Sequence, residues 1–482
     1  MPKLLSNKGT AGTATTARIA LWYAFSSIFV KGMAFLTTPI FTRLLSKSDF
    51  GLFSNFTSWE AILTIIVTLD FTASIARAKY DFDDTMDTYI SSIVVASNIV
   101  TLISWGIVEL NRGFFQDLFS MDIMYIRLMF VYILFIPAFS YLQTKHRIYR
   151  KYKFFVAFAI SSALIRTGVS VLLVILMQNK FMGRVLGYVV PTTIMNIILW
   201  IVIIYRGKKV NWKSIKYASV IALPLIPHLL SGIVLGSSDR IMITQYVGAE
   251  ANAMYTLAYQ ISLLANLLWT SMNQAYSPWL FDKLHENKHA EIRKNSKLYL
   301  GLFAVLIIGV LFITPELILV LGGKRYYEAI YVMPPVIMGC VFQFVYGMYV
   351  NLEIYSKKTV MISAGTMAAA LLNIGLNIIF IPKFGYIAAA YTTLVGYAAL
   401  FVFHLCIVRF KFKELISVYD LKFNFMIILI LFVCSGLSLM LYQIHVIRYV
   451  IGAIYGFLLI FFAFRYRNKI LSLLGVKRAN EV

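Results

Sequence analysis

The sequence is poor in charged residues, which make up only 13% of its 482 positions. A soluble protein of this length carries roughly a quarter charged residues. Hydrophobic residues make up 60% of the chain, and apolar runs long enough to cross a bilayer recur from end to end. The scarcity of charge argues against a soluble globular protein and predicts an all-α polytopic membrane protein.

Cysteine and the known catalytic motifs are also scarce. The three cysteines, Cys340, Cys406 and Cys434, all fall in apolar segments, as expected of small buried side chains rather than of a disulfide framework. The sequence has no phosphate loop, no H-E-x-x-H, no paired cysteine ligands and no G-x-S-x-G. We therefore expect no enzymatic activity, no cofactor and no metal site.

One acidic run, DFDD at 81–84, is a feature that a metal-binding glycosyltransferase also has. Here it falls on a short predicted loop without an accompanying catalytic domain. A solvated loop is the interpretation that we adopt.

Acidic residues are few, 21 against 44 lysines and arginines, which gives a net charge of +23. Runs of ~20 apolar residues predict about fourteen transmembrane helices. Most basic residues then fall in the tails and even-numbered loops. The odd-numbered loops hold only Arg43, Lys47, Arg112, Lys180, Lys324, Arg325, Lys383 and Arg448.

By the positive-inside rule, this asymmetry predicts that both termini are cytoplasmic. The positive charge thus reflects topology, and we expect no nucleic-acid partner. The loops HRIYRKYK (146–153) and RGKKVNWKSIK (206–216) are basic enough to touch anionic lipid headgroups.

The chain resembles itself at an offset of about 202 residues. SDFGLFS (48–54) aligns with EANAMYT (250–256), and KFMGRVLGY (180–188) aligns with PKFGYIAAA (382–390). A repeat of six helices inserts both copies in the same orientation, as in alternating-access transporters. The predicted division is a cytoplasmic tail (1–17), an N-terminal six-helix bundle (18–205), a C-terminal six-helix bundle (217–409), two appended helices (423–468) and a second cytoplasmic tail (469–482).

Several basic residues fall inside predicted spans, where each central charge costs roughly 2.5–3.5 kcal/mol on the gentlest insertion scale. They must therefore face a partner or a wet cavity. We predict that Lys31, Arg166, Arg240 and Arg127 line such a cavity. Arg184 lies near enough to the start of its span to reach the surface by snorkelling, so both positions stay open for it.

Other polar residues form similar stripes at helical spacing, or lie inside or at the ends of predicted spans. The predicted cavity-lining residues are Glu60, Asp70, Asp239, His228, Asn373 and Asn377. Hydrogen bonding between helices is the alternative for the asparagine and threonine positions.

The stretch LPLIPHLLSGIVLGSSDRIMI (223–243) predicts an interrupted span. Pro224 and Pro227 free backbone carbonyls that need water or protein partners, which a cavity wall supplies. For Asp239 and Arg240, a local ion pair near the membrane surface is the alternative to a place in the cavity.

The same stretch, extended to LPLIPHLLSGIVLGSSDRIMITQYVGAEANAMYTLAYQIS, resembles Wzx-type oligosaccharide flippases of the MOP exporter superfamily. TRLLSKSDFGLFS (42–54), TPELILVLGGKRYYEA (314–329) and NIGLNIIFIPKFGYIAAAYTTLVGY (373–397) resemble further motifs of that family. The resemblance covers nearly the whole chain and is more specific to the superfamily than to the branch.

The resemblance implies transport of undecaprenyl-diphosphate-linked oligosaccharide repeat units across the bacterial cytoplasmic (inner) membrane, for O-antigen, capsule or other surface polysaccharide. Its implied partners are the lipid-linked oligosaccharide, membrane lipids, and a polysaccharide polymerase with its chain-length regulator. Intramembrane cations agree with a diphosphate cargo. A multidrug cation exporter of the same superfamily is the main alternative, and an integral membrane glycan polymerase or ligase is a third.

Overall fold

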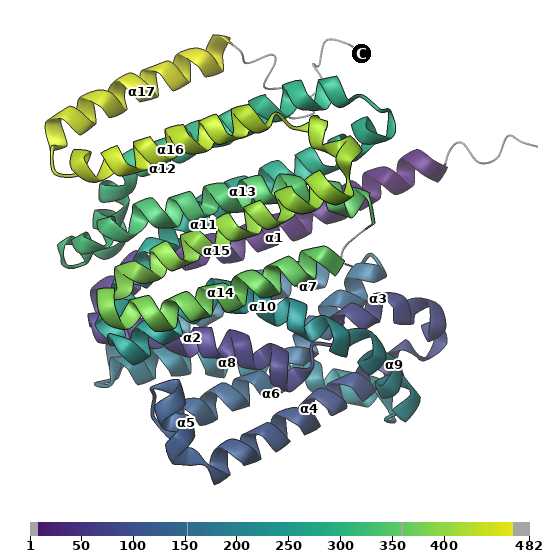
Figure 1. The fold of residues 1–482 in the computed structure, drawn as a ribbon. Coiled ribbons are helices and arrows are strands. Elements are labelled where there is room, and N and C mark those ends of the chain that lie inside the picture. Colours follow the sequence, from purple (N-terminus) through teal and green to yellow (C-terminus); the bar gives the residue numbers. More distant parts are fainter. Residues whose placement is uncertain (1–7, 152, 358–359, 466–482) are drawn as a thin grey trace, which may run out of the picture. The chain divides into compact units, whose positions relative to one another are not determined.

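The computed structural model describes residues 8–151, 153–357 and 360–465, whose course Figure 1 shows. The described residues form helices joined by short loops and contain no β-strand, which confirms the all-α prediction. They divide into two compact units. The first comprises the described residues of Met1–Thr256 and Asn377–Tyr386, and the second those of Leu257–Leu376 and Ile387–Val482.

The helices of the first half of the chain are α1 (Lys8–Leu44), α2 (Lys47–Thr68), α3 (Thr72–Asp81), η1 (Asp83–Thr85), α4 (Met86–Leu110), α5 (Arg112–Phe119), α6 (Ile123–Ile148), α7 (Lys153–Leu176), α8 (Lys180–Gly207), α9 (Trp212–Ala222), η2 (Leu223–Leu225) and α10 (Ile226–Tyr246). Those of the second half are α11 (Ala249–His285), α12 (His289–Gly322), η3 (Lys324–Val332), α13 (Met333–Tyr355), α14 (Val360–Phe384), α15 (Tyr386–Lys411), η4 (Lys413–Val418), α16 (Leu421–Leu441) and α17 (His445–Arg465).

Twelve helical segments among the described residues are long and apolar enough to cross a membrane. Helix α11 is long, at 37 residues, but more polar, and α17 contributes a shorter apolar segment, His445–Phe461. With these two helices the count agrees with the predicted number of about fourteen. The predicted tail 469–482 and the first seven residues of the tail 1–17 lie outside the described residues. The bundle boundaries at 18–205 and 217–409 stay a prediction.

Short polar side chains cap the N-termini of several helices. Ser46 accepts a hydrogen bond from the backbone N–H of Asp49 at 3.0 Å at the start of α2. Asp122 accepts one from the N–H of Met124 at 2.8 Å at the start of α6. Because the first N–H groups of a helix have no partner within it, these side chains fix where each span starts.

The predicted interruption at the two prolines is confirmed. Helix α9 ends at Ala222, the 3₁₀ turn η2 spans Leu223–Leu225, and α10 begins at Ile226. Proline removes a backbone donor and clashes with the preceding turn, so Pro224 and Pro227 account for the break.

In the first unit α7 and α8 pack closely, and two glycines of α8 make this possible. A Cβ on Gly187 would lie 2.2 Å from the Cα of Ser170, and one on Gly183 would lie 2.7 Å from the carbonyl oxygen of Leu173. Small residues allow helix backbones to approach in this way. The close packing fixes the register of α7 against α8, and with it the polar residues that the two helices carry.

In the second unit α12 and α13 each pack against α16, as Figure 1 shows. Two pairs with a buried side chain join other helices there. His404 of α15 lies 2.6 Å from Glu353 of α13, both fully buried, and Arg448 of α17 pairs with Glu316 of α12 at 2.5 Å. Buried charges are tolerated in a membrane protein when they are paired in this way.

Candidate functional site

Glu60 is the acidic residue of the site and comes from the middle of α2. Its side chain is buried, and its Oε1 accepts a hydrogen bond from the Thr64 hydroxyl at 3.2 Å. Thr64 follows Glu60 by four residues, so both lie on one face of the helix. A carboxylate at this depth requires further partners.

Those partners come from α7 and α8. The Tyr188 hydroxyl of α8 donates to Oε2 of Glu60 at 3.4 Å. The guanidinium of Arg166 in α7 lies over the same tyrosine, 4.8 Å from the centre of its ring, and interacts electrostatically with Glu60. Tyr188 therefore links the predicted cation and the predicted carboxylate through its ring face and its hydroxyl.

A second arginine lies one helical turn before Tyr188. The Arg184 guanidinium carbon is 3.6 Å from the centre of the Phe41 ring and 4.2 Å from that of Phe53. Its Nε is buried and has no hydrogen-bond partner among the described residues. Arg184 therefore packs against aromatic faces inside the first unit, and one of its donors is left available.

Glu60, Arg166, Arg184 and Tyr188 form what we call the arginine cluster. The two arginines and the carboxylate all act electrostatically on Tyr188, which places them in one environment. With Glu60 ionised, the cluster carries a net positive charge inside the membrane-spanning part of the first unit. Guanidinium groups bind phosphate oxygens through paired N–H donors, so the cluster is suited to an anion.

Asp239 and Asn377, both predicted to line the cavity, are in contact. Asn377 donates to Oδ1 of Asp239 at 2.7 Å, and the Tyr255 hydroxyl donates to Oδ2. Asp239 is 1% exposed, so these bonds satisfy its two oxygens. Its neighbour Arg240 accepts a hydrogen bond on its backbone carbonyl from Thr244 at 2.8 Å.

Two other predicted residues form hydrogen bonds with threonines. Asp70 lies in the turn between α2 and α3, where its Oδ1 accepts from the Thr72 hydroxyl at 2.5 Å, and its φ of 28° is left-handed. In the second unit Asn373 donates to the Thr393 hydroxyl at 3.1 Å. This bond is the helix-to-helix alternative that the sequence left open.

The remaining predicted residues are Arg127, His228 and Lys31. Arg127 forms a two-pronged pair with Glu109, at 2.7 and 2.9 Å, so its charge already has a partner. His228, near the start of α10, has a buried Nδ1 without a hydrogen-bond partner in the described part of the chain. Lys31 lies on α1, and its side chain is outside what the structure describes.

Sequence reasoning missed Tyr188, which is one of 30 tyrosines. The available signal was its spacing from Arg184, four residues along one helix, which places both side chains on the same face. That spacing predicts a shared face but not the approach of Arg166 from α7, because the approach depends on the close α7–α8 packing.

Comparison with known proteins gives a family, a relative and two solved structures of similar fold. Residues 17–284 match the family model described as "Polysaccharide biosynthesis protein". A protein of Haemophilus influenzae, described as "Lsg locus putative protein 1", is 23% identical over 377 residues, which cover 73% of this chain and 88% of that protein.

Among solved structures, one titled "Lipid II flippase MurJ, inward closed conformation" matches with a TM-score of 0.71 at 16% identity. The match covers 94% of this chain and all of the other. An inward-facing multidrug resistance MATE family transporter of the MOP superfamily matches with a TM-score of 0.53 at 15% identity, over 82% of this chain and 95% of that one. At these identities the two matches establish a shared fold.

Proposed function

Because the chain belongs to the polysaccharide biosynthesis protein family, we propose that it moves undecaprenyl-diphosphate-linked oligosaccharide repeat units across the bacterial cytoplasmic membrane. The resemblance to Wzx-type flippases supplies the substrate class. The fold shared with a lipid II flippase is compatible with a lipid-linked cargo. No chemical step on the substrate is part of this function.

The observation that carries the proposal is the arginine cluster. A diphosphate group cannot leave water without cations to replace its hydration. Arg166 and Arg184 supply two guanidinium groups within membrane-spanning helices, and Tyr188 and Glu60 hold one of them in place. Lys31 and Arg240 are the further cations that we assign to the same pathway.

The proposed mechanism is alternating access, in which the cationic site is open to one side of the membrane at a time. The diphosphate binds at the arginines from the cytoplasmic side and is released on the other side. Moving two negative charges out of a negative interior is favoured by about 4–5 kcal/mol per 100 mV. A polymerase and its chain-length regulator then receive the repeat unit.

A multidrug cation exporter is the competing function, and Glu60 is the residue that favours it, because a buried carboxylate attracts a lipophilic cation. Two arginines act on the same environment as this single acid, and they repel such a substrate. The cluster therefore fits an anion better than a cation.

The test is reconstitution of the purified protein into liposomes that contain a fluorescent undecaprenyl-diphosphate oligosaccharide. We expect the label to reach the opposite leaflet faster than in protein-free liposomes, and faster with the wild type than with Arg166→Gln. Export of a lipophilic cation by the same liposomes, without movement of the lipid-linked sugar, would instead establish the cation exporter.

A further inference from the structure

A cavity of about 620 Å³ opens where α6 ends, α7 begins and α8 ends, in the first unit. Its wall combines two kinds of side chain. The apolar ones are Leu142, Phe154, Phe155, Ile198, Leu199 and Val202, and the basic ones are His146, Arg150, Lys151, Lys153 and Arg206. We call it the basic pocket. It contains no residue of the arginine cluster.

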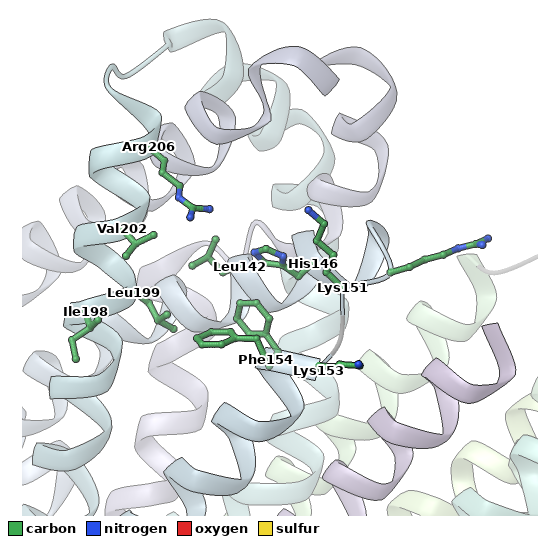
Figure 2. A pocket seen from close by; sticks show the side chains of 11 residues that line it. Leu142, His146, Lys151, Lys153, Phe154, Ile198, Leu199, Val202 and Arg206 are labelled. Carbon is green, nitrogen blue, oxygen red and sulfur yellow. The ribbon is translucent and has the colours of Figure 1, made fainter. Parts of the chain in front are cut away.

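Three of the basic residues converge on the pocket. Figure 2 shows Arg206, His146 and Lys151 reaching toward one space from different parts of the wall, next to Phe154. His146 has Lys151 and Arg206 among its electrostatic neighbours, which agrees with this view. Lys151 and Arg206 both carry a positive charge and repel one another, so their convergence favours binding of an anion.

Two nearby carboxylates, Asp87 and Asp83, already interact with residues outside the pocket. Lys145 pairs with Asp87 at 2.6 Å, and the Tyr149 hydroxyl donates to Asp83. In contrast, Lys151 and Arg206 have no ion pair within the described ranges of the chain. The pocket thus has unneutralised positive charge next to a hydrophobic wall.

The basic pocket lies at the ends of membrane-crossing helices. The spans around it end at Ile148 and Gly207 and begin at Lys153, so it lies where membrane-crossing helices meet the interface. The loops there, 146–153 and 206–216, are on the predicted cytoplasmic side, whose leaflet surface is negatively charged. Phe154 is 59% exposed and Ile198 58%, so the apolar wall is accessible from outside.

We propose that the basic pocket binds an anionic phospholipid of the surrounding bilayer. Its phosphate is held by Arg206, Lys151 and His146, and the upper part of an acyl chain lies along Phe154, Ile198 and Val202. A free phosphate ion would not bind the apolar wall, and a neutral lipid would not bind the cations. An anionic phospholipid would contact both. The volume is within the range of ~300–1,000 Å³ that is common for ligand sites.

The experiment is native mass spectrometry of the full-length protein in detergent, titrated with phosphatidylglycerol and, separately, with phosphatidylcholine. The variant carries Arg206→Gln and Lys151→Gln. The matched control carries Lys213→Gln and Lys216→Gln, which remove two exposed lysines of α9 outside the pocket. Phe154→Ser tests the apolar wall without changing the charge.

We expect the wild type to prefer phosphatidylglycerol, and the pocket variant to bind it about tenfold more weakly, because it removes the two cations that converge on the place of the phosphate. The control should bind like the wild type, and Phe154→Ser should weaken binding on its own. Equal loss in the control and the pocket variant, or no loss in either, would overturn the proposal.

Two competition experiments complete the test. Displacement of phosphatidylglycerol by millimolar inorganic phosphate would show that the site takes a free ion. Preferential binding of undecaprenyl phosphate would show that it takes the carrier lipid. Either result would overturn the assignment to a bilayer phospholipid. The assay requires no transport, so its outcome is independent of the proposed function.

Discussion

The Ser54 and Thr256 hydroxyls are hydrogen-bonded at 2.6 Å, and the two residues are 202 positions apart. This separation equals the offset at which the sequence aligns with itself. A second contact joins residues 201 positions apart: the Asn252 side chain donates to the Gly51 carbonyl at 2.9 Å. Two copies related by a two-fold axis touch through equivalent residues where the axis passes. The contact is compatible with the repeat, which stays a prediction.

Gly51, which takes part in this contact, has no room for a side chain. A Cβ there would lie 1.8 Å from the Ala249 carbonyl oxygen. We expect Gly51→Ala to lower the free energy of unfolding by about 3 kcal/mol or more, because a backbone must move. Gly106→Ala is the matched control, since its Cβ would meet nothing within 4 Å. Thermal unfolding in detergent measures both, and equal melting temperatures would contradict the account.

Tyr188→Phe separates the two roles of that residue. It keeps the ring under Arg166 and removes the hydroxyl that donates to Glu60. A single hydrogen bond contributes roughly 0.5–1.5 kcal/mol, so we expect transport to fall about threefold to tenfold. Tyr205→Phe, at an exposed tyrosine of the same helix, should have no effect. An unchanged rate for Tyr188→Phe would show that the hydroxyl does not position the site.

The buried pair in the second unit gives a prediction about stability. His404 and Glu353 are both fully buried, and Glu353→Leu leaves the His404 Nδ1 without its partner. An unsatisfied buried group costs about 1–3 kcal/mol. The double variant Glu353→Leu with His404→Leu should unfold at a higher temperature than either single variant. A double variant that is less stable than both would contradict a pairwise interaction.

The topology prediction is tested by reporters that are active on only one side of the membrane. A fusion at Lys209 should report a cytoplasmic position, and one at Gly323, between α12 and η3, should report the opposite side. The physical reason is the concentration of basic residues in the even-numbered loops. The same side for both reporters would contradict the predicted map of about fourteen spans.

The sequence predicted the helices well because apolar runs and prolines are local features that can be recognised without knowing how the helices pack. The break at Pro224 and Pro227, for example, needs no tertiary information. The sequence also made Glu60 and Arg166 candidates for the site, since a charge inside a span is costly wherever it faces.

The sequence could not predict which side chains these charged residues contact. Whether Asp239 pairs locally or with Asn377, 138 residues away, depends on how helices pack. The same holds for Arg184, whose neighbours Phe41 and Phe53 come from α1 and α2. Helical spacing gives the face of a residue, and only the packed structure gives what that face meets.

The central claim is that the arginine cluster binds the substrate diphosphate, and its most direct test compares Arg166→Gln with Arg166→Lys. Both variants would be expressed in a strain that lacks its own flippase, and surface glycan would be measured at equal amounts of membrane-inserted protein. Loss of surface glycan with Arg166→Gln and partial export with Arg166→Lys is the predicted result, because lysine keeps the charge but not the paired donors. Normal export by an abundant Arg166→Gln protein would contradict the account.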